Sequence, residues 1–189
     1  IVRAALVHYQ FETAHPFLDG NGRLGRLLIT LMLINDGVLH SCLFYPSFQF
    51  KKNRSEYYRQ LTSVRERGTY EEWIEFFCNS LLESAKDSVG SLKNLVDLHN
   101  RSTATITENL GRTAANGQRL LGILEEHPIV DTAFIAAQLD IGRSTASSLV
   151  KSFEELGILR PLDESRQRYR QYGYEEYLSI FREDAEPIR

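Results

Sequence analysis

Residues 15–26, HPFLDGNGRLGR, lie between two stretches with helical periodicity. The middle of this segment, Gly20-Asn21-Gly22, stands where a loop becomes a helix. Glycines at such a junction let successive backbone N–H groups turn inward, and the partial positive charge of the helix N-terminus then favours an anion. The sequence therefore predicts an anion-binding bend at residues 20–22.

Two arginines follow this bend. Arg23 and Arg26 are three residues apart, so they lie on the same side of the first helical turn, where both can reach a bound anion. Cations at a helix N-terminus oppose the helix dipole. A polyphosphate ligand would explain why two of them stand here.

Two further side chains in the segment have suitable chemistry. Asp19 could hold Mg²⁺, which typically takes one or two carboxylates together with phosphate oxygens and water. His15 can be neutral near pH 7 and could take a proton from an attacking hydroxyl. Together with the bend and the arginines, these are the parts that transfer of a phosphorus-containing group requires.

Simpler explanations exist for each part taken alone. A glycine-rich turn before a helix is common, and a single histidine is more often structural or on the surface. His15 and Asp19 have too few neighbouring ligands for a structural metal site. No Gly-Lys-Ser/Thr follows the glycines, which excludes a Walker-type P-loop. Phe17 is most simply a core anchor that holds the loop.

The composition bounds the class of protein. A chain of 189 residues with 42% hydrophobic residues and a net charge of -3 is ordinary for a soluble globular protein, and it excludes disordered, collagen-like and nucleic-acid-coating proteins. The densest apolar run, residues 27–34, is about half of the ~20 residues that a bilayer requires, so we expect no membrane association. Cys42 and Cys78 are too few for a disulfide framework, which predicts a cytoplasmic location.

Periodicity predicts a mainly helical first part. Helices are expected over residues 1–12, from 21 to 37, over 53–67 and, with interruptions, from a Thr69–Glu72 capping box to about 110. The second of these is apolar almost all round, so it should be the buried centre of the domain. Residues 41–50 are interpreted as a loop with a short turn, because Pro46 breaks the stretch and no partner strand is near.

The sequence also indicates that the chain is a piece of a longer protein. It opens at Ile1, its single methionine is Met32, and the apolar stripe of the first helix is already running at the first residue. We therefore expect that the start of this helix, and partners before it, lie outside the sequence.

The last third has a different pattern. Residues 119–126, 131–139 and 144–156 are predicted helices, and residues 158–162 and 169–172 are predicted to pair as a hairpin. This is the order of a winged helix-turn-helix. The predicted fold class is an all-α core over residues 1–110, a glycine-containing linker at 111–117 and a winged helix-turn-helix domain over 118–189.

The charge of the predicted winged helix is only mildly positive. Residues 143–170 carry six basic and four acidic side chains, whereas DNA-binding domains usually show a stronger basic patch. The sequence therefore favours a protein partner or a packing role for this domain and leaves DNA contact open. It also leaves a homodimer open.

The segment HPFLDGNGRLGR matches His-x-Phe-x-Asp/Glu-Gly-Asn-Gly-Arg-x-x-Arg, the signature of the Fic (filamentation induced by cyclic AMP) family. The resemblance covers about residues 1–110, and the whole chain resembles bacterial Fic proteins with a C-terminal winged helix. It implies a protein adenylyltransferase that moves AMP from ATP·Mg²⁺ to a Ser, Thr or Tyr hydroxyl of a target protein and releases pyrophosphate.

The resemblance also implies roles for single residues. His15 would be the general base and Asp19 the Mg²⁺ ligand. The glycine bend would cradle the α- and β-phosphates, and the two arginines would engage the β- and γ-phosphates. The positions expected to bind nucleotide are Gly20, Asn21, Gly22, Arg23, Leu24, Gly25 and Arg26.

A tyrosine pair downstream of the motif borders the nucleotide pocket in this family. Tyr57 and Tyr58 fall where that pair is expected, although core packing explains either residue equally well. A substrate-docking flap and an autoinhibitory helix are also typical of the family. Neither is found in this sequence, and we expect both to precede Ile1.

Other activities on the same scaffold stay open. Transfer of UMP or phosphocholine would use the same parts. Death-on-curing toxins resemble this family and act as kinases, but they carry a lysine in the bend where this chain has Gly22. A DNA-binding regulator that only senses nucleotide is the third alternative. The complete set of His15, Asp19, Arg23 and Arg26 argues against it, because a sensor does not need a base.

Overall fold

The computed structural model describes residues 1–40, 46–163 and 170–182. Packing divides the chain into two units, of which unit 1 comprises residues 1–90 and unit 2 begins at Ser91. Unit 1 is built from helices, and unit 2 combines helices with a small sheet. The predicted all-α core is therefore confirmed.

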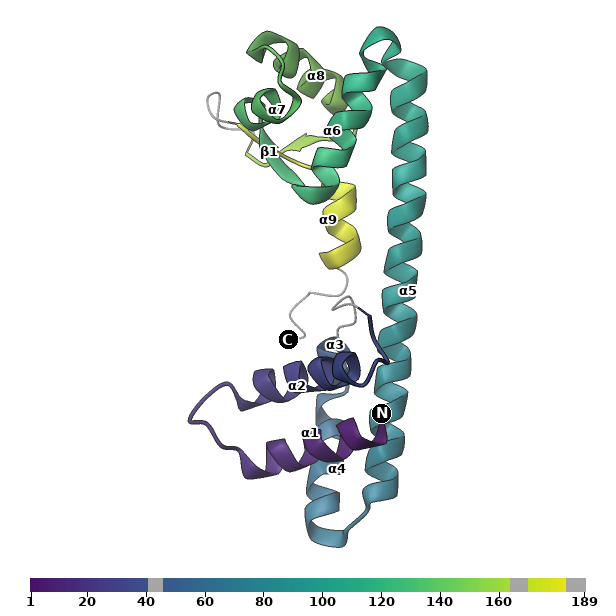
Figure 1. Ribbon diagram of the computed structural model, residues 1–189, viewed down its shortest axis with the longest axis vertical. Coiled ribbons are helices and arrows are strands. Elements are labelled where there is room, and N and C mark those ends of the chain that lie inside the picture. Colours follow the sequence, from purple (N-terminus) through teal and green to yellow (C-terminus); the bar gives the residue numbers. More distant parts are fainter. Residues whose placement is uncertain (41–45, 164–169, 183–189) are drawn as a thin grey trace. The chain divides into compact units, whose positions relative to one another are not determined.

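In the residues of unit 1 that the structure describes, there are four helices and the first half of a fifth. They are α1 (Val2–Ala14), α2 (Asn21–Asn35), α3 (Ser47–Lys52), α4 (Arg54–Arg67) and the first part of α5 (Tyr70–Asn109). Helices α1 and α2 pack side by side, and the loop of residues 15–20 joins them at one end (Figure 1). The predicted bend, residues 20–22, lies where this loop enters α2.

Aromatic side chains make up much of the core of unit 1. Trp73 and Phe77 of α5 are completely buried, and Phe50 of α3 and Tyr57 of α4 are nearly so. The indole N–H of Trp73 donates to the carbonyl oxygen of Ala5 at 3.0 Å, which ties α5 to α1. The side of α5 that carries Trp73 and Phe77 is thus a core face.

Two predictions about helices in unit 1 are wrong. Part of the segment interpreted as a loop is the helix α3, whose Phe50 is 2% exposed and packs into the core; residues 41–45 lie outside the described residues. Helix α5 runs without interruption for 40 residues.

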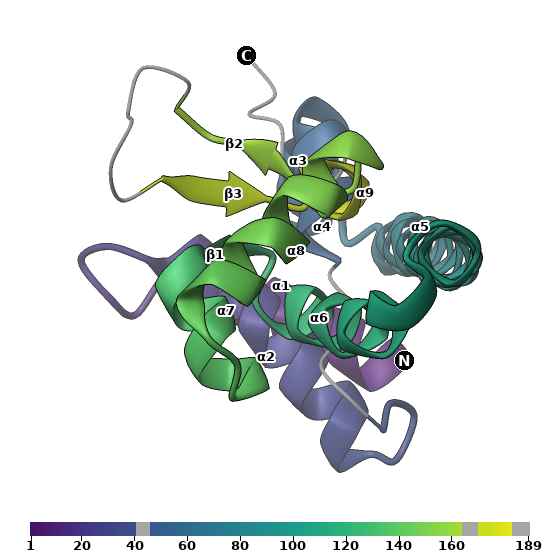
Figure 2. The same ribbon diagram turned by 90° about the horizontal axis from the view of Figure 1, so that it is seen from above.

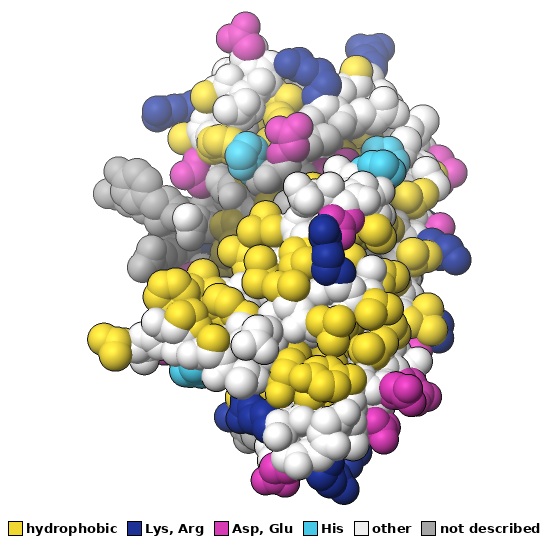
Figure 3. Space-filling view, turned by 60° about the horizontal axis from the view of Figure 1, so that its bottom comes forward, with side chains coloured by type: hydrophobic (Ala, Val, Ile, Leu, Met, Phe, Trp, Pro, Cys, Tyr) yellow, Lys and Arg dark blue, Asp and Glu magenta, His cyan; other side chains and the backbone are white. Residues whose placement is uncertain are grey.

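Helix α2 is not buried on all sides in this chain. Leu24, Leu27 and Leu31 follow one another at helical spacing and are 42–52% exposed, whereas Ile29 and Leu33 on the other face are buried. Figure 3 shows hydrophobic side chains gathered over α1 and α2. The prediction of a buried central helix is therefore wrong for one face of α2, because no described element packs against that face.

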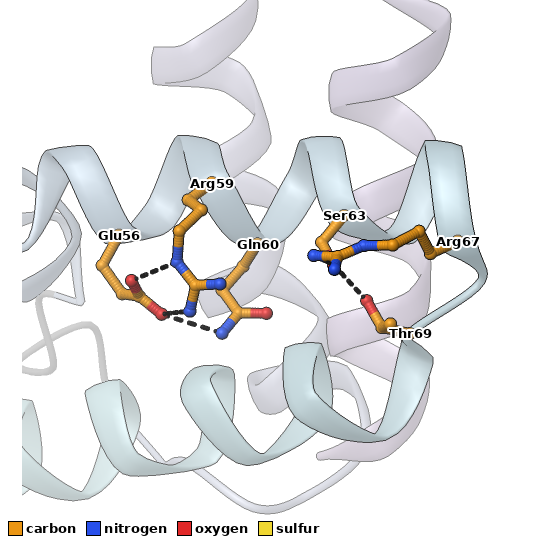
Figure 4. A network of polar contacts seen from close by, with 6 residues as sticks. All are labelled: Glu56, Arg59, Gln60, Ser63, Arg67 and Thr69. Carbon is orange, nitrogen blue, oxygen red and sulfur yellow. Dashed lines mark hydrogen bonds and ion pairs between the residues drawn. The ribbon is translucent and has the colours of Figure 1, made fainter.

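A polar network joins the end of α4 to the start of α5 (Figure 4). Arg67 donates to the Ser63 hydroxyl at 2.8 Å, and this hydroxyl lies 2.7 Å from that of Thr69. Gly68 between them has φ 71°, the left-handed conformation that ends α4. Helix α5 begins next to Thr69, as predicted, but the Thr69 hydroxyl is bonded to Ser63.

Unit 2 follows the second half of α5. Its elements are a 3₁₀ turn (Gly111–Thr113), α6 (Ala114–Glu126), β1 (Ile129–Asp131), α7 (Thr132–Leu139), α8 (Arg143–Glu155), β2 (Arg160–Pro161), β3 (Gln171–Gly173) and α9 (Glu175–Arg182). The strands form an antiparallel sheet in the order β1-β3-β2 (Figure 2).

The predicted hairpin is confirmed by the pairing of β2 with β3, and its turn lies outside the described residues. Strand β1 was not predicted, because Pro128 indicated only a break. Asp131 ends this strand and caps α7, accepting from the backbone N–H of Phe134 at 2.8 Å.

The predicted linker at residues 111–117 consists of the 3₁₀ turn and the first turn of α6. The division that packing indicates falls earlier, between Gly90 and Ser91 and inside α5. Along the part of the chain that the structure describes, none of the helices combines the length and the apolar character needed to cross a bilayer.

Candidate active site

The motif segment, residues 15–26, begins where α1 ends. His15 is the C-cap of α1 with φ 45° and ψ 55°, and its backbone N–H donates to Phe11 O at 3.0 Å. A residue other than glycine rarely adopts this left-handed conformation. It turns the chain out of the helix at this point, and the imidazole of His15 is exposed to solvent.

Asn21 fixes the shape of the loop. Its side-chain oxygen accepts from the Phe17 N–H at 2.9 Å, and its side-chain nitrogen donates to Phe17 O at 2.5 Å. Asn21 is 2% exposed, so its side chain serves the loop and leaves its backbone N–H for a ligand. The side chain of Phe17 is 53% exposed. The loop is held through the backbone of Phe17, so the interpretation of the Phe17 ring as a core anchor is wrong.

Helix α2 starts with unpaired backbone donors. Its N-cap, Gly20, has φ 82° and no side chain to cap the helix. The N–H of Leu24 makes the first helical bond, to Gly20 O at 3.0 Å. The N–H groups of residues 21–23 precede that bond, so they are the donors that a helix N-terminus offers to an anion.

Both arginines of the motif lie at this bend. A terminal nitrogen of Arg23 is 3.6 Å from the place where a Cβ of Gly20 would stand. A terminal nitrogen of Arg26 is 3.1 Å from the corresponding place at Gly22. The two guanidinium groups therefore both lie at the glycine bend, one beside Gly20 and the other beside Gly22.

Asp19 is the candidate metal ligand. Its side chain is 95% exposed, one carboxylate oxygen accepts from the Gly20 N–H at 2.6 Å, and the other lies 3.6 Å from Arg23 Nη2. Among the described residues, no three His, Cys, Asp or Glu side chains form a metal site. A single carboxylate still suits Mg²⁺ when phosphate oxygens and water complete the shell.

A buried histidine of α1 is hydrogen-bonded to the backbone of the motif helix α2. His8 is completely buried, and its Nδ1 lies 2.9 Å from Gly25 O. Because a carbonyl only accepts, Nδ1 must carry the proton, and Nε2 then accepts from the Tyr57 hydroxyl at 2.9 Å. Burial lowers the pKa of His8 to about 4, with the charge of Arg26 adding to the effect and the bond to Gly25 opposing it.

Gly25 allows α1 and α2 to approach closely. A Cβ at this position would stand 2.4 Å from Glu12 Oε1 and 3.2 Å from the ring atoms His8 Cε1 and Phe11 Cδ1. Gly25 therefore serves the helix crossing. The sequence placed His8 on the apolar face of the first helix but predicted no role at the site for His8 or for Glu12, although both are buried in α1 at i, i+4 spacing.

The two tyrosines occupy different environments. Tyr57 is 5% exposed, packs among Phe50, Trp73 and the His8 ring, and uses its hydroxyl to bond His8; burial raises the pKa of this hydroxyl well above its usual range. Tyr58 is half exposed, with the Arg54 guanidinium 5.7 Å from its ring centre. Tyr58, like the exposed Leu24 of α2, is open to a ligand.

Comparison with known proteins identifies the motif. The sequence model of the Fic/DOC family matches residues 1–33. Protein adenylyltransferase fic-1 of Caenorhabditis elegans is 33% identical over 97 residues, which are 51% of this chain and 18% of that protein. Protein adenylyltransferase Fic of Drosophila grimshawi is 37% identical over 76 residues, which are 40% of this chain and 14% of that protein.

The chain spans less than a fifth of the length of these relatives. The similarity and the two arginines at the bend concern the same segment, the end of α1, the bend and the start of α2. This chain is therefore similar to the Fic/DOC family over residues 1–33 and to protein adenylyltransferases of the Fic type over about half of its length.

Proposed function

We propose that this chain carries the active-site segment of a protein adenylyltransferase, which transfers AMP from ATP to a Ser, Thr or Tyr hydroxyl of a target protein. The observation that carries the proposal is the position of the Arg23 and Arg26 guanidinium groups at the glycine bend. The names of the two similar proteins, both protein adenylyltransferases, support this choice among phosphorus-group transfers.

The residues of the bend have separate roles in this reaction. The N–H groups of residues 21–23 and the two guanidinium groups bind the phosphates of ATP and compensate their negative charge. Asp19 would hold Mg²⁺, which supplies further charge compensation when bound. Tyr58 and Leu24 are open to contact with the rest of the nucleotide.

His15 acts on the acceptor. Its imidazole takes the proton of the target hydroxyl as the hydroxyl oxygen forms a bond to the α-phosphorus. The bond between the α-phosphorus and the oxygen that bridges to the β-phosphate breaks, and pyrophosphate leaves with that oxygen. The left-handed backbone at His15 and the bonds of Asn21 to Phe17 hold the base and the bend in one loop.

We assign unit 2 as a winged helix-turn-helix from its order of helix, strand, two helices and hairpin. Its mild charge favours a protein partner over DNA. The domain boundaries proposed from the sequence, 1–110, 111–117 and 118–189, would place all of α5 with the catalytic part.

Isotope labelling tests the reaction. The full-length protein is incubated with cell lysate and with ATP labelled at either the α- or the γ-phosphate. We expect label on protein only from α-labelled ATP, because AMP keeps the α-phosphorus. Label only from γ-labelled ATP would identify a kinase and overturn the proposal.

A variant of His15 tests the base. His15→Ala should lower the rate of AMP transfer by ~10²–10⁴ and leave ATP binding nearly unchanged, because the phosphate contacts are intact. His40→Ala, which replaces an exposed histidine of the same unit, is the matched control and should transfer AMP at the wild-type rate. Unchanged transfer by His15→Ala would remove this residue from the mechanism.

A further inference from the structure

A buried carboxyl group lies beneath the motif and has no role in the reaction as described. Glu12, in the last turns of α1, is 8% exposed, and its Oε1 has no hydrogen-bond partner among the described residues. A buried polar atom without a partner costs about 1–3 kcal/mol, and a buried carboxylate costs more. A group that lowers stability in this way calls for a functional reason.

The place of Glu12 connects it to the phosphate-binding bend. Its Oε1 lies against Gly25, where α1 and α2 cross, and the next residue of α2 is Arg26. The guanidinium of Arg26 extends from this crossing back over Gly22. Glu12 thus lies at the helix crossing beside Gly25, the residue before Arg26, and the guanidinium of Arg26 lies at the bend.

The charges of this region are coupled to one another. Burial raises the pKa of Glu12, while the positive charges of Arg26, His15 and Arg65 oppose that rise, Arg26 most strongly. Arg26 also acts on the two buried neighbours of Glu12: it lowers the pKa of His8 and opposes the rise in the pKa of Tyr57. Such interactions are stronger in the protein interior than in water, because the effective dielectric constant is lower.

We propose that Glu12 is a positioning residue whose buried carboxylate attracts the guanidinium of Arg26 and keeps it over Gly22, ready for the outer phosphates of a nucleoside triphosphate. The inference rests on the proposed function in naming the nucleotide as the anion. Glu12 touches no reacting atom in this scheme; it acts through Arg26.

A purely structural role for Glu12 makes a different prediction. If the carboxyl group mainly stabilised the crossing of α1 and α2, its replacement by an amide would lower the thermal stability and weaken every ligand alike. If it positions Arg26, the amide should leave stability unchanged or raise it, because a costly buried charge is removed. Only ligands that reach Arg26 should then bind less tightly.

The experiment compares nucleotides of different length on the full-length protein. Dissociation constants of α,β-methylene-ATP and of AMP are measured by titration calorimetry for the wild type, for Glu12→Gln and for Glu71→Gln, a matched control at an exposed glutamate of the same unit. We expect Glu12→Gln to bind the triphosphate about tenfold more weakly, to bind AMP as the wild type does, and to have an unchanged or higher melting temperature. The control should match the wild type in all three measurements.

A double-mutant cycle shows whether the effect passes through Arg26. Adding Glu12→Gln to an Arg26→Gln background should cause no further loss of triphosphate affinity. The same loss in both backgrounds, an unchanged affinity in the single variant, or a parallel loss for AMP with a lower melting temperature would each overturn the proposal.

These readouts need binding and no transfer. If the labelling experiment fails while Glu12→Gln still weakens the triphosphate alone, the proposed reaction is wrong and the role of Glu12 stands. If AMP transfer is found and Glu12→Gln binds as the wild type does, the role of Glu12 is wrong and the reaction stands.

Discussion

His8 lies beneath the motif with its ring stacked between those of Phe50 and Trp73, at centroid distances of 5.9 and 6.2 Å. Both ring nitrogens are used, one by Gly25 and one by Tyr57. One side chain thus connects α1 to the motif helix and to α4. Its neutral form is the one that fits, since the ring is completely buried.

The stability of unit 1 should therefore depend on this residue in acid. The pKa of His8 falls from 6.5 to about 4 on folding, so the stability it contributes is fully present above pH 6.5 and is lost as the pH falls toward 4. The loss should be on the order of 3 kcal/mol. Denaturant unfolding followed by Trp73 fluorescence measures it, because Trp73 is the single tryptophan and lies in the same core.

Two variants serve as controls for this measurement. His8→Phe should be less stable at neutral pH, because Tyr57 and Gly25 lose a partner, but it should lack this loss between pH 6.5 and 4. Glu12→Gln should show a steeper loss than the wild type, because the raised pKa of Glu12 favours the folded state as this carboxyl becomes protonated. The prediction would be contradicted if the free energy of unfolding did not fall between pH 6.5 and 4, either in the wild type or in Glu12→Gln.

At the scale of elements, the close crossing of α1 and α2 depends on glycine at position 25, which has no side chain. Gly25→Ala would place a Cβ 2.4 Å from Glu12 Oε1 and 3.2 Å from His8 Cε1. Since the buried Glu12 carboxyl group and the buried His8 ring must move to admit it, we expect a loss of about 1–3 kcal/mol in the free energy of unfolding.

Gly90→Ala is the matched control, because Gly90 is inside α5 with nothing within 4 Å of the new Cβ. This substitution should raise stability by up to about 1 kcal/mol. Both variants are measured by denaturant unfolding. Equal stability of Gly25→Ala and the wild type would show that the two helices can separate without loss.

Local patterns in the sequence were sufficient for most helices and for the motif. The glycine bend, both arginines and the stop at Gly68 follow from residue spacing and from the conformations that glycine allows, which are properties of neighbouring residues. Helix α3 and strand β1 were missed because each is short and is held by distant partners: Phe50 by the aromatic core, and β1 by its pairing with β3.

The roles of the buried residues His8 and Glu12 could not be predicted either, because they too depend on partners that are distant in the sequence. His8 and Glu12 belong to an ordinary helical pattern until α2 crosses α1 at Gly25. Asn21 was predicted to cradle phosphate, yet its side chain is used to close the loop on Phe17. A sequence motif names the residues that recur together, but only the fold separates those open to a ligand from those that hold the loop.

At the scale of the whole molecule, the described residues form two separate hydrophobic cores. One contains Trp73 and Phe77 of unit 1, and the other contains Phe153 and Leu120 of unit 2. No buried residue belongs to both cores among those described. This separation predicts that the two units lose their structure independently.

Two matched core variants test this independence. Phe77→Ala and Phe153→Ala each remove a completely buried ring, at a cost of about 3–5 kcal/mol. We expect Phe77→Ala to lower the midpoint of the Trp73 fluorescence transition. Phe153→Ala should leave that midpoint unchanged while circular dichroism shows an earlier loss of helix. A shift of the fluorescence midpoint in both variants would mean that the chain unfolds as one cooperative body.

Helix α5 belongs to both cores, with Leu81 buried in the first and Leu98 in the second. Among the described residues, none from Ser88 to Asp97 belongs to either hydrophobic core. Core packing therefore supports this part of α5 only through the anchored turns on both sides of it. An expression fragment of either unit should therefore include all of the residues from Ser88 to Asp97. A fragment cut at Gly90 would leave a frayed end only a few turns from the packed rings of Trp73 and Phe77.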